Sequence, residues 1–282
     1  MAQTTIDLLN RGIQANQTDQ FRRGNLICPP AEGSLVIGGD LHGHRRNYER
    51  IVAYSGLADH PDRHLVLQEI IHGGPEDHAG GCLSYQLLLD AIRLKLDFPD
   101  RVHLVMGNHD TACITISDVM KNGKEMNRAM SSALDREFQD ASDDVKLAIR
   151  QFLFSQPLAV KCANRIWISH SLPANRFAET FDPDIFTREL QVRDCEKPGS
   201  AYLLTWGRRH SQDTLNRMAE RLDTDVFVLG HQAQPKGWCR AGDNLLILAS
   251  DHNHGCLLEF DLAQSYTAEE LAARTIPLAS LA

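Results

Sequence analysis

The sequence predicts an α/β fold in which buried strands alternate with helices. Short apolar runs, each ending in a polar turn that contains glycine, recur from residue 34 onward, and amphipathic segments lie between them. Strands that are buried on both faces read as continuous apolar runs, and helices then cover the sheets. Parallel or mixed β-structure with helices outside it is therefore expected. The 282 residues suffice for a substantial core in one large domain or two small ones.

Residues 1–33 are expected to form a helical extension. Ile6, Leu9 and Ile13 have the spacing of one helix face. Gly24 and then Pro29-Pro30 are expected to close this stretch, because proline cannot continue a helix.

Three apolar runs that follow are expected to be strands that lead into polar turns. They are Leu35–Ile37 before Gly38-Gly39-Asp40, Leu65–Leu67 before Glu69 and His72, and Val102–Met106 before Gly107-Asn108-His109-Asp110. In open α/β sheets, ligand-binding groups gather in turns beyond the carboxyl ends of the strands. The polar side chains of these turns are thus expected to lie near one another.

Helical and strand patterns divide the rest of the chain. The apolar spacing predicts a helix over 83–94 and a helical insert or cap over 112–156, where Met126, Met130, Leu134 and Phe138 recur every four residues. Strands are expected again at 158–160, 166–168, 226–229, 245–248 and 256–260. The main domain is expected to span 34–262, and residues 263–282 form a weakly patterned tail.

Composition excludes several classes of protein. The formal net charge of -8 argues against nonspecific nucleic-acid binding, which needs a basic surface. No run approaches the roughly 20 apolar residues of a membrane helix, and no signal peptide is visible at the start. The seven scattered cysteines are expected to be buried thiols of a reducing compartment. A cytoplasmic protein without membrane or nucleic-acid partners is expected, and the oligomeric state stays open.

Five strand-end turns carry side chains that bind metal ions. They hold Asp40 with His42, Glu69, Asn108 with His109, His170 and His231. Residues i and i+2 of an extended chain point to the same side, so Asp40 and His42 can face one point. Each residue alone has a simpler interpretation as a turn, a cap or a core histidine, as His103 inside its apolar run does. Five successive occurrences favour a metal site.

The ligand types indicate which metal and which chemistry. Carboxylate and imidazole together suit manganese, iron or zinc better than calcium. Two divalent ions about 3.5–4 Å apart can clamp a phosphoryl oxygen and generate a hydroxide nucleophile near neutral pH. Neither a Gly-x-Ser-x-Gly elbow nor a phosphate-binding P-loop motif suggests a different mechanism.

In order and content, these motifs resemble the calcineurin-like metallophosphoesterase superfamily, and within it most closely the phosphoprotein phosphatase (serine/threonine phosphatase-like) family. Gly39-Asp40-Leu41-His42-Gly43 resembles the family's Gly-Asp-x-His-Gly, and Gly107-Asn108-His109-Asp110 its Gly-Asn-His-Glu/Asp. Ser169-His170 and Gly230-His231-Gln232 are similar to its two later histidine motifs. The resemblance covers roughly residues 34–260.

The resemblance implies a β-sandwich flanked by helices, with two metal ions, manganese being the first choice, at one edge. It implies Asp40, His42 and Glu69 on the first ion, and Glu69, Asn108, His170 and His231 on the second. His109 is then the general acid that protonates the leaving group. The implied substrate is a phosphomonoester, phosphoprotein Ser/Thr or a small molecule. The alternative is a dinucleoside polyphosphate or another nucleotide.

One motif departs from the family pattern. Where the family has Gly-Asp-x-x-Asp-Arg-Gly, this chain reads Gln68-Glu69-Ile70-Ile71-His72-Gly73-Gly74. Glu69 keeps a bridging carboxylate, but the Asp that orients the general acid becomes His72, and the phosphate-binding Arg becomes Gly73. A second imidazole orients the acid less well than a carboxylate, and glycine cannot bind phosphate.

Two hypotheses follow from this departure. In the first, His72 and His109 share the acid function, and phosphate is bound by one or more of Arg45, Arg46, Arg208 and Arg209. In the second, the chain is a non-catalytic module that binds metal and a phosphorylated ligand.

Overall fold

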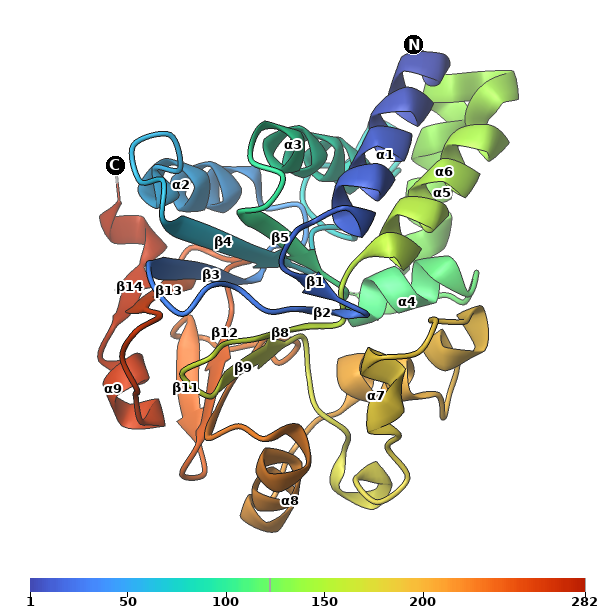
Figure 1. Cartoon of the computed structure of the whole chain (residues 1–282). Coiled ribbons are helices and arrows are strands. Elements are labelled where there is room, and N and C mark those ends of the chain that lie inside the picture. Colours follow the sequence, from blue (N-terminus) through green and yellow to red (C-terminus); the bar gives the residue numbers. More distant parts are fainter. Residues whose placement is uncertain (122, 282) are drawn as a thin grey trace.

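The computed structural model describes residues 1–121 and 123–281; residue 122 of the expected insert and residue 282 of the expected tail lie outside the described residues. Two sheets face each other, and helices cover their outer sides (Figure 1). One sheet has the order β14 (Thr275–Pro277), β13 (Cys256–Asp261), β3 (Ser34–Asp40), β4 (Arg63–Gln68), β5 (Val102–Val105). The other has the order β1 (Arg22–Arg23), β2 (Leu26–Ile27), β8 (Ala159–Lys161), β9 (Ile166–Ser169), β10 (Val226–Leu229), β12 (Leu245–Leu248), β11 (Trp238–Ala241). The predicted α/β sandwich flanked by helices is confirmed.

Parallel pairing brings strand ends together in both sheets. In the first sheet β3, β4 and β5 are parallel neighbours, and in the second β9, β10 and β12 are. The carboxyl ends of these strands therefore lie at common edges, which is where polar turns can meet.

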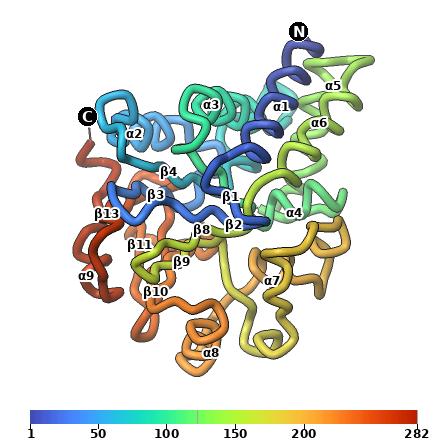
Figure 2. The backbone as a smooth tube through the Cα atoms, in the orientation of Figure 1, coloured from blue at the N-terminus to red at the C-terminus, as the bar shows by residue number. Residues whose placement is uncertain are grey.

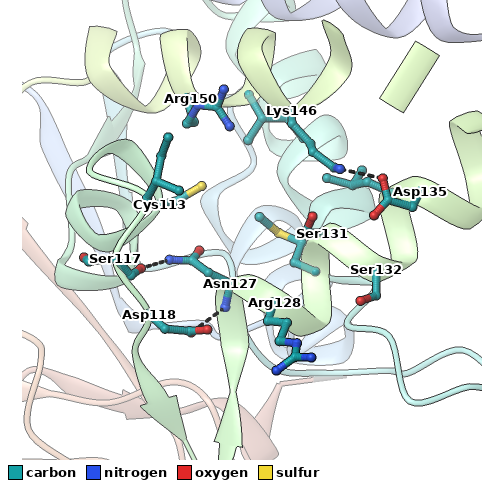
Figure 3. A pocket seen from close by; sticks show the side chains of 14 residues that line it. Cys113, Ser117, Asp118, Asn127, Arg128, Ser131, Ser132, Asp135, Lys146 and Arg150 are labelled. Carbon is teal, nitrogen blue, oxygen red and sulfur yellow. Dashed lines mark hydrogen bonds and ion pairs between the residues drawn. The ribbon is translucent and has the colours of Figure 1, made fainter. Parts of the chain in front are cut away.

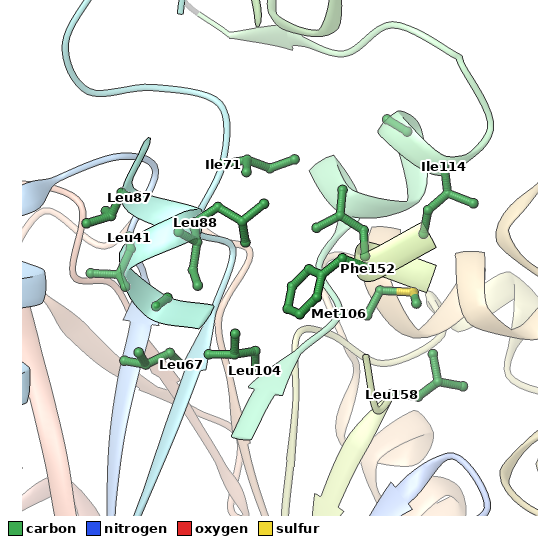
Figure 4. Close-up of a cluster of buried hydrophobic side chains, with 14 of the residues drawn as sticks. Leu41, Leu67, Ile71, Leu87, Leu88, Leu104, Met106, Ile114, Phe152 and Leu158 are labelled. Atoms are coloured by element: carbon green, nitrogen blue, oxygen red, sulfur yellow. The ribbon is translucent and has the colours of Figure 1, made fainter. Parts of the chain in front are cut away.

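The central residues of the longer strands are apolar because both faces of these strands are buried. Along β3, Leu35 and Ile37 belong to one cluster, made of strands from both sheets and residues 268–272, whereas Val36 belongs to a second cluster that includes most of the other helices. Successive side chains of a strand point to opposite faces, so β3 contributes to both cores. In the second cluster, Leu67 and Leu104 of the sheet lie with Leu88 and Phe152 of the helices (Figure 4).

The N-terminal helix lies against the helical insert (Figure 2). Helix α1 (Ala2–Gln17) packs on α3 (Ser84–Asp97) and α6 (Ser142–Ser155), and Gly12 permits a close approach because a Cβ there would lie 2.8 Å from Ile92 and 2.9 Å from Phe152. The expectation that Gly24 closes the helix is wrong: α1 ends at Gln17, since the chain then turns to bury Asp19 and to pair β2 with β8.

The insert region contains more than helices. It comprises α4 (Asn108–Ile114), a hairpin of β6 (Met120–Lys121) and β7 (Lys124–Glu125), α5 (Met126–Phe138) and α6. The remaining helices are α2 (Arg45–Ser55), α7 (Ser200–Trp206), α8 (Gln212–Leu222) and α9 (Ala268–Ala272). Among the described residues, no helix is long and apolar enough to cross a membrane.

Candidate metal centre

The expected ligand residues gather where strands of the two sheets end. Asp40 is the last residue of β3, Glu69 follows β4, and Asn108 opens α4 after β5. From the other sheet, His170 follows β9 and His231 follows β10 by two residues. All five of these side chains are buried, and His42 is 10 % exposed. The two sheets thus contribute to one buried polar centre.

Four of the local residues hold an unusual backbone conformation. His42, Glu69, His72 and His231 have positive φ angles of 44°, 46°, 67° and 66°. This left-handed region is unfavourable for side chains other than glycine, costing about 1 kcal/mol or more per residue. Such strain persists only where surrounding contacts impose it, and here it turns side chains toward the centre.

Four atoms that can bind a metal ion lie close together in one half of the centre. His170 Nε2 lies 2.9 Å from both Asn108 Oδ1 and Glu69 Oε2. His231 Nδ1 lies 2.8 Å from the same Asn108 oxygen. An amide oxygen, a carboxylate and two imidazoles around one point form a ligand set that suits a transition-metal dication.

The other half of the centre is formed by Asp40, His42 and Glu69. His42 Nε2 lies 3.9 Å from Asp40 Oδ2, and one ligand atom each of His42, Glu69 and His109 lies within 4.8 Å of the other two. The carboxylate of Glu69 faces both halves. It also accepts a hydrogen bond from the backbone N–H of His109 at 3.1 Å.

Burial disfavours the charged forms of the ligand side chains. It raises the pKa of Asp40 to about 6 and that of Glu69 to about 8, because water no longer solvates the carboxylates. It lowers the pKa of His42 to about 3, and also lowers the pKa of His170 and His231. Neutral imidazoles are ready to bind metal, and a dication would compensate the buried carboxylates. The residues present therefore fit divalent ions.

Two orienting contacts were not anticipated. Gln68 Oε1 lies 3.0 Å from His170 Nδ1, so Gln68 fixes the ring whose other nitrogen faces Glu69. The backbone N–H of His231 donates to Asp40 Oδ1 at 2.9 Å. The sequence signal for the first contact was the polar Gln68 directly before Glu69, in a buried strand.

His72 lies behind His109. Their Nδ1 atoms are 3.0 Å apart, so one ring donates to the other, and the backbone N–H of His72 donates to Ser84 Oγ. Burial lowers the pKa of His72 to about 3 and also lowers that of His109, hence both rings are neutral near pH 7. Neutral His72 can fix the tautomer of His109 without charging it.

A cavity of about 440 Å³ lies within the insert (Figure 3). Asp118 and Asn127 line it, and the Asp118 carboxylate opposes the burial effect on the pKa of His72. His72 Nε2 has no hydrogen-bond partner among the described residues. The cavity lies in the helical insert and is separate from the ligand cluster.

The expected phosphate-binding arginines occupy different places. Arg208 Nε donates to His231 Nε2 at 2.9 Å, which puts its guanidinium at the centre. Arg45 instead pairs with Asp90 of α3 at 2.7 Å. Arg46 and Arg209 are exposed. Only Arg208 of this group contacts a ligand residue among the hydrogen bonds of the described chain.

Gly107 explains how the Glu69 carboxylate fits. A Cβ at Gly107 would lie 2.7 Å from Glu69 Cδ, closer than side chains tolerate. Gly107→Ala is expected to displace that carboxylate and weaken divalent-metal binding about 10- to 100-fold, the range seen when metal-site support is lost. Calorimetric titration with Mn²⁺ measures this. In the control Gly38→Ala, the nearest atom to a Cβ would be the flexible end of Ile51 at 3.1 Å, and no ligand residue lies among its three nearest contacts. Equal losses in both variants would contradict the prediction.

Comparisons with known proteins show the family and the fold of the chain. Residues 34–235, more than half of the chain, match the family model for calcineurin-like phosphoesterases. A probable serine/threonine-protein phosphatase from Encephalitozoon cuniculi is 24% identical over 233 residues, covering 76% of this chain and 46% of that protein. The chain thus spans about half the length of this curated relative.

Two solved structures share the fold. A serine/threonine phosphatase from Saccharomyces cerevisiae has a TM-score of 0.69 at 13% identity, covering 92% of this chain and 82% of that one. A cold-active protein-tyrosine phosphatase from a psychrophilic Shewanella has a TM-score of 0.62 at 13% identity, covering 91% of this chain and 83% of that one. At these identities the likeness concerns the fold.

Proposed function

Because the chain belongs to the calcineurin-like phosphoesterase family, we propose that it is a metal-dependent phosphatase that hydrolyses phosphomonoesters with two divalent ions. The observation that carries the proposal is the convergence of Glu69, Asn108, His170 and His231 donor atoms within 2.8–2.9 Å contacts. Asp40 and His42 complete a second ligand group that shares Glu69. Manganese is the proposed metal, since the set mixes carboxylate, amide and imidazole.

Each residue of the centre has a definite task in this proposal. When bound, the ions supply polarisation of the phosphoryl oxygens and a water molecule of lowered pKa. Asp40, His42 and Glu69 would hold the first ion, and Glu69, Asn108, His170 and His231 would hold the second. Gln68 and the backbone of His231 keep His170 and Asp40 in place.

His109 is proposed to protonate the departing alkoxide. Its backbone N–H is fixed to Glu69 and its Nδ1 to His72, so the ring is held beside the ligand cluster. His72 takes over the positioning that an aspartate provides in the family. Both rings are neutral near pH 7, so His109 must collect its proton when the phosphorylated substrate adds negative charge nearby.

Arg208 is proposed to bind the phosphoryl group. Its side chain is anchored through Nε to His231, which leaves the two terminal nitrogens of the guanidinium for a phosphate. A phosphoprotein Ser/Thr residue is the proposed substrate class, in line with the name of the Encephalitozoon relative.

The decisive experiment compares purified protein with its His109→Ala variant, using Mn²⁺ and p-nitrophenyl phosphate. We expect wild-type turnover and a loss of about 10²- to 10⁴-fold in the variant, the usual range for general acid catalysis. His60→Ala, at an exposed histidine, is the matched control and should keep the wild-type rate. Equal, negligible rates for wild type and His109→Ala would support a non-catalytic module instead.

A substrate panel then tests the class. Peptides with phosphoserine, phosphothreonine and phosphotyrosine, and diadenosine tetraphosphate, are compared by kcat/KM. Faster cleavage of the dinucleotide than of every phosphopeptide would overturn the phosphoprotein assignment while leaving the metal chemistry intact.

A further inference from the structure

The position that carries the phosphate-binding arginine in the family has no room for any side chain here. Gly73 has a φ of 152°, and a Cβ on it would lie 2.4 Å from the backbone oxygen of His42. The loop after β4 is therefore packed directly against the Asp40–His42 turn. On this side of the centre, a positive charge for the phosphoryl group has to come from another element.

The β6–β7 hairpin of the insert carries a lysine, Lys121, that pairs with a residue near the first ligand turn. Lys121, at the end of β6, forms an ion pair of 3.2 Å with Asp251, and each of the two side chains is 25 % exposed. The pair joins segments that are far apart in the sequence. It ties the hairpin to the chain that follows β12.

Asp251 lies at the rim of the metal centre. The adjacent residue, Ser250, donates its backbone N–H to the Asp40 carbonyl at 3.1 Å, and its hydroxyl accepts from Gly39 N–H at 2.9 Å. Ala249 forms a β-bridge with Asp40 itself. Lys121 is thereby held by a residue whose two preceding neighbours bond to the first ligand turn.

Two cationic side chains come to the ligand cluster from different elements. Lys121 is held by Asp251, next to the segment that pairs with Asp40. Arg208 is held by its hydrogen bond to His231. One cation therefore lies beside each half of the ligand cluster.

We propose that Lys121, on the insert hairpin, binds a phosphoryl oxygen of the substrate together with Arg208, in place of the arginine that the family carries at the position of Gly73. An ammonium has three donors, so Lys121 can keep its bond to Asp251 and still donate to the phosphate. The exposed quarter of the side chain gives the ligand access. This inference rests on the proposed phosphatase function.

The test measures phosphate binding as well as turnover. Inorganic phosphate is titrated calorimetrically into manganese-loaded wild type, Lys121→Met, which keeps the aliphatic stem, and Lys121→Arg, which keeps the charge. Loss of one charge-assisted hydrogen bond is expected to weaken phosphate affinity about 10-fold or more in Lys121→Met and to raise KM for p-nitrophenyl phosphate. Lys121→Arg should recover most of the affinity.

Lys124→Met is the matched control. Lys124 lies on the other strand of the same hairpin and pairs with Glu76 at 2.8 Å. The Lys124→Met variant should bind phosphate with the affinity of wild type. Its melting temperature and manganese content should equal those of Lys121→Met. Wild-type affinity in Lys121→Met, an equal loss in Lys124→Met, or no phosphate binding by wild type would each overturn the inference.

These outcomes separate the inference from the function on which it rests. If the wild type hydrolyses no phosphoester but binds phosphate through Lys121, the proposed function fails and the binding site stands. If the wild type is active and Lys121→Met has unchanged KM and phosphate affinity, the function stands and the role of Lys121 is excluded.

Discussion

Glu69→Gln is expected to lower kcat by about 10³-fold or more and to leave fewer than two manganese ions per chain, since metal polarisation contributes several kcal/mol. Glu69 is 1 % exposed, and its carboxylate faces both ligand groups. The amide keeps the shape but removes the negative charge that two dications require. Steady-state kinetics and elemental analysis of the purified variant measure the two effects.

Glu69→Asp makes the prediction sharper. It restores the residue type of the family motif but withdraws the carboxylate by one methylene from a site built around the longer side chain. We expect a rate between those of Glu69→Gln and wild type. Glu49→Gln, at a 60 % exposed glutamate, is the control and should change neither rate nor metal content. Two bound ions and wild-type turnover in Glu69→Gln would contradict the two-metal proposal.

Most of the strands could be predicted because they are buried on both faces. The runs around Leu35, Val226 and Leu245 are apolar at every position, since alternate side chains enter the two hydrophobic clusters. Strands β1 and β2 are two residues long, and β11 and β14 are partly exposed. Neither an apolar run nor an alternation marks them, so sequence patterns missed them.

The structure brings together the six residues expected as metal ligands, because each lies at or just after the end of a strand that the apolar pattern identified. The positions of the arginine and lysine side chains were harder to predict from the sequence. Arg45 and Arg208 look alike in the sequence, but Asp90 holds the first at α3 and His231 holds the second at the centre. The sequence did not single out Lys121, because its hairpin lies within a stretch that has helical spacing. Its position depends on Asp251, a contact over 130 residues that no local pattern records.

The residues at the end of β4 that differ from the family motif make contacts around the same centre. Gln68 orients His170, His72 contacts His109, and Gly73 lets the loop pack on His42. With no side chain at Gly73, the insert hairpin can supply its lysine to the same region. The departures from the family pattern therefore change the residues around the centre but keep a carboxylate, Glu69, at the position of the family's bridging aspartate.

A buried charge network ties the N-terminal segment to the domain. Asp19 Oδ2 accepts from Lys95 Nζ at 2.7 Å and lies 3.1 Å from His103 Nδ1, whose other ring nitrogen is 3.1 Å from His64 Nδ1. The side chains of Asp19, Lys95 and His103 are at most 1 % exposed. His103 is thus the core histidine that its apolar run predicted. Lys95 and His103 lower the pKa of Asp19 although burial alone would raise it, so the carboxylate is charged in the folded protein.

Asp19→Ala is therefore expected to destabilise the fold by about 3–5 kcal/mol, because it leaves the Lys95 ammonium buried without its counter-charge. The free energy of unfolding in urea measures this. Asp7→Ala, at an exposed aspartate of α1, is the control and should change stability by no more than about 0.5 kcal/mol. The double variant Asp19→Ala/Lys95→Met should recover much of the loss, since removing both charges costs less than isolating one. If the double variant is less stable than Asp19→Ala alone, the unpaired ammonium is not the cause of the destabilisation.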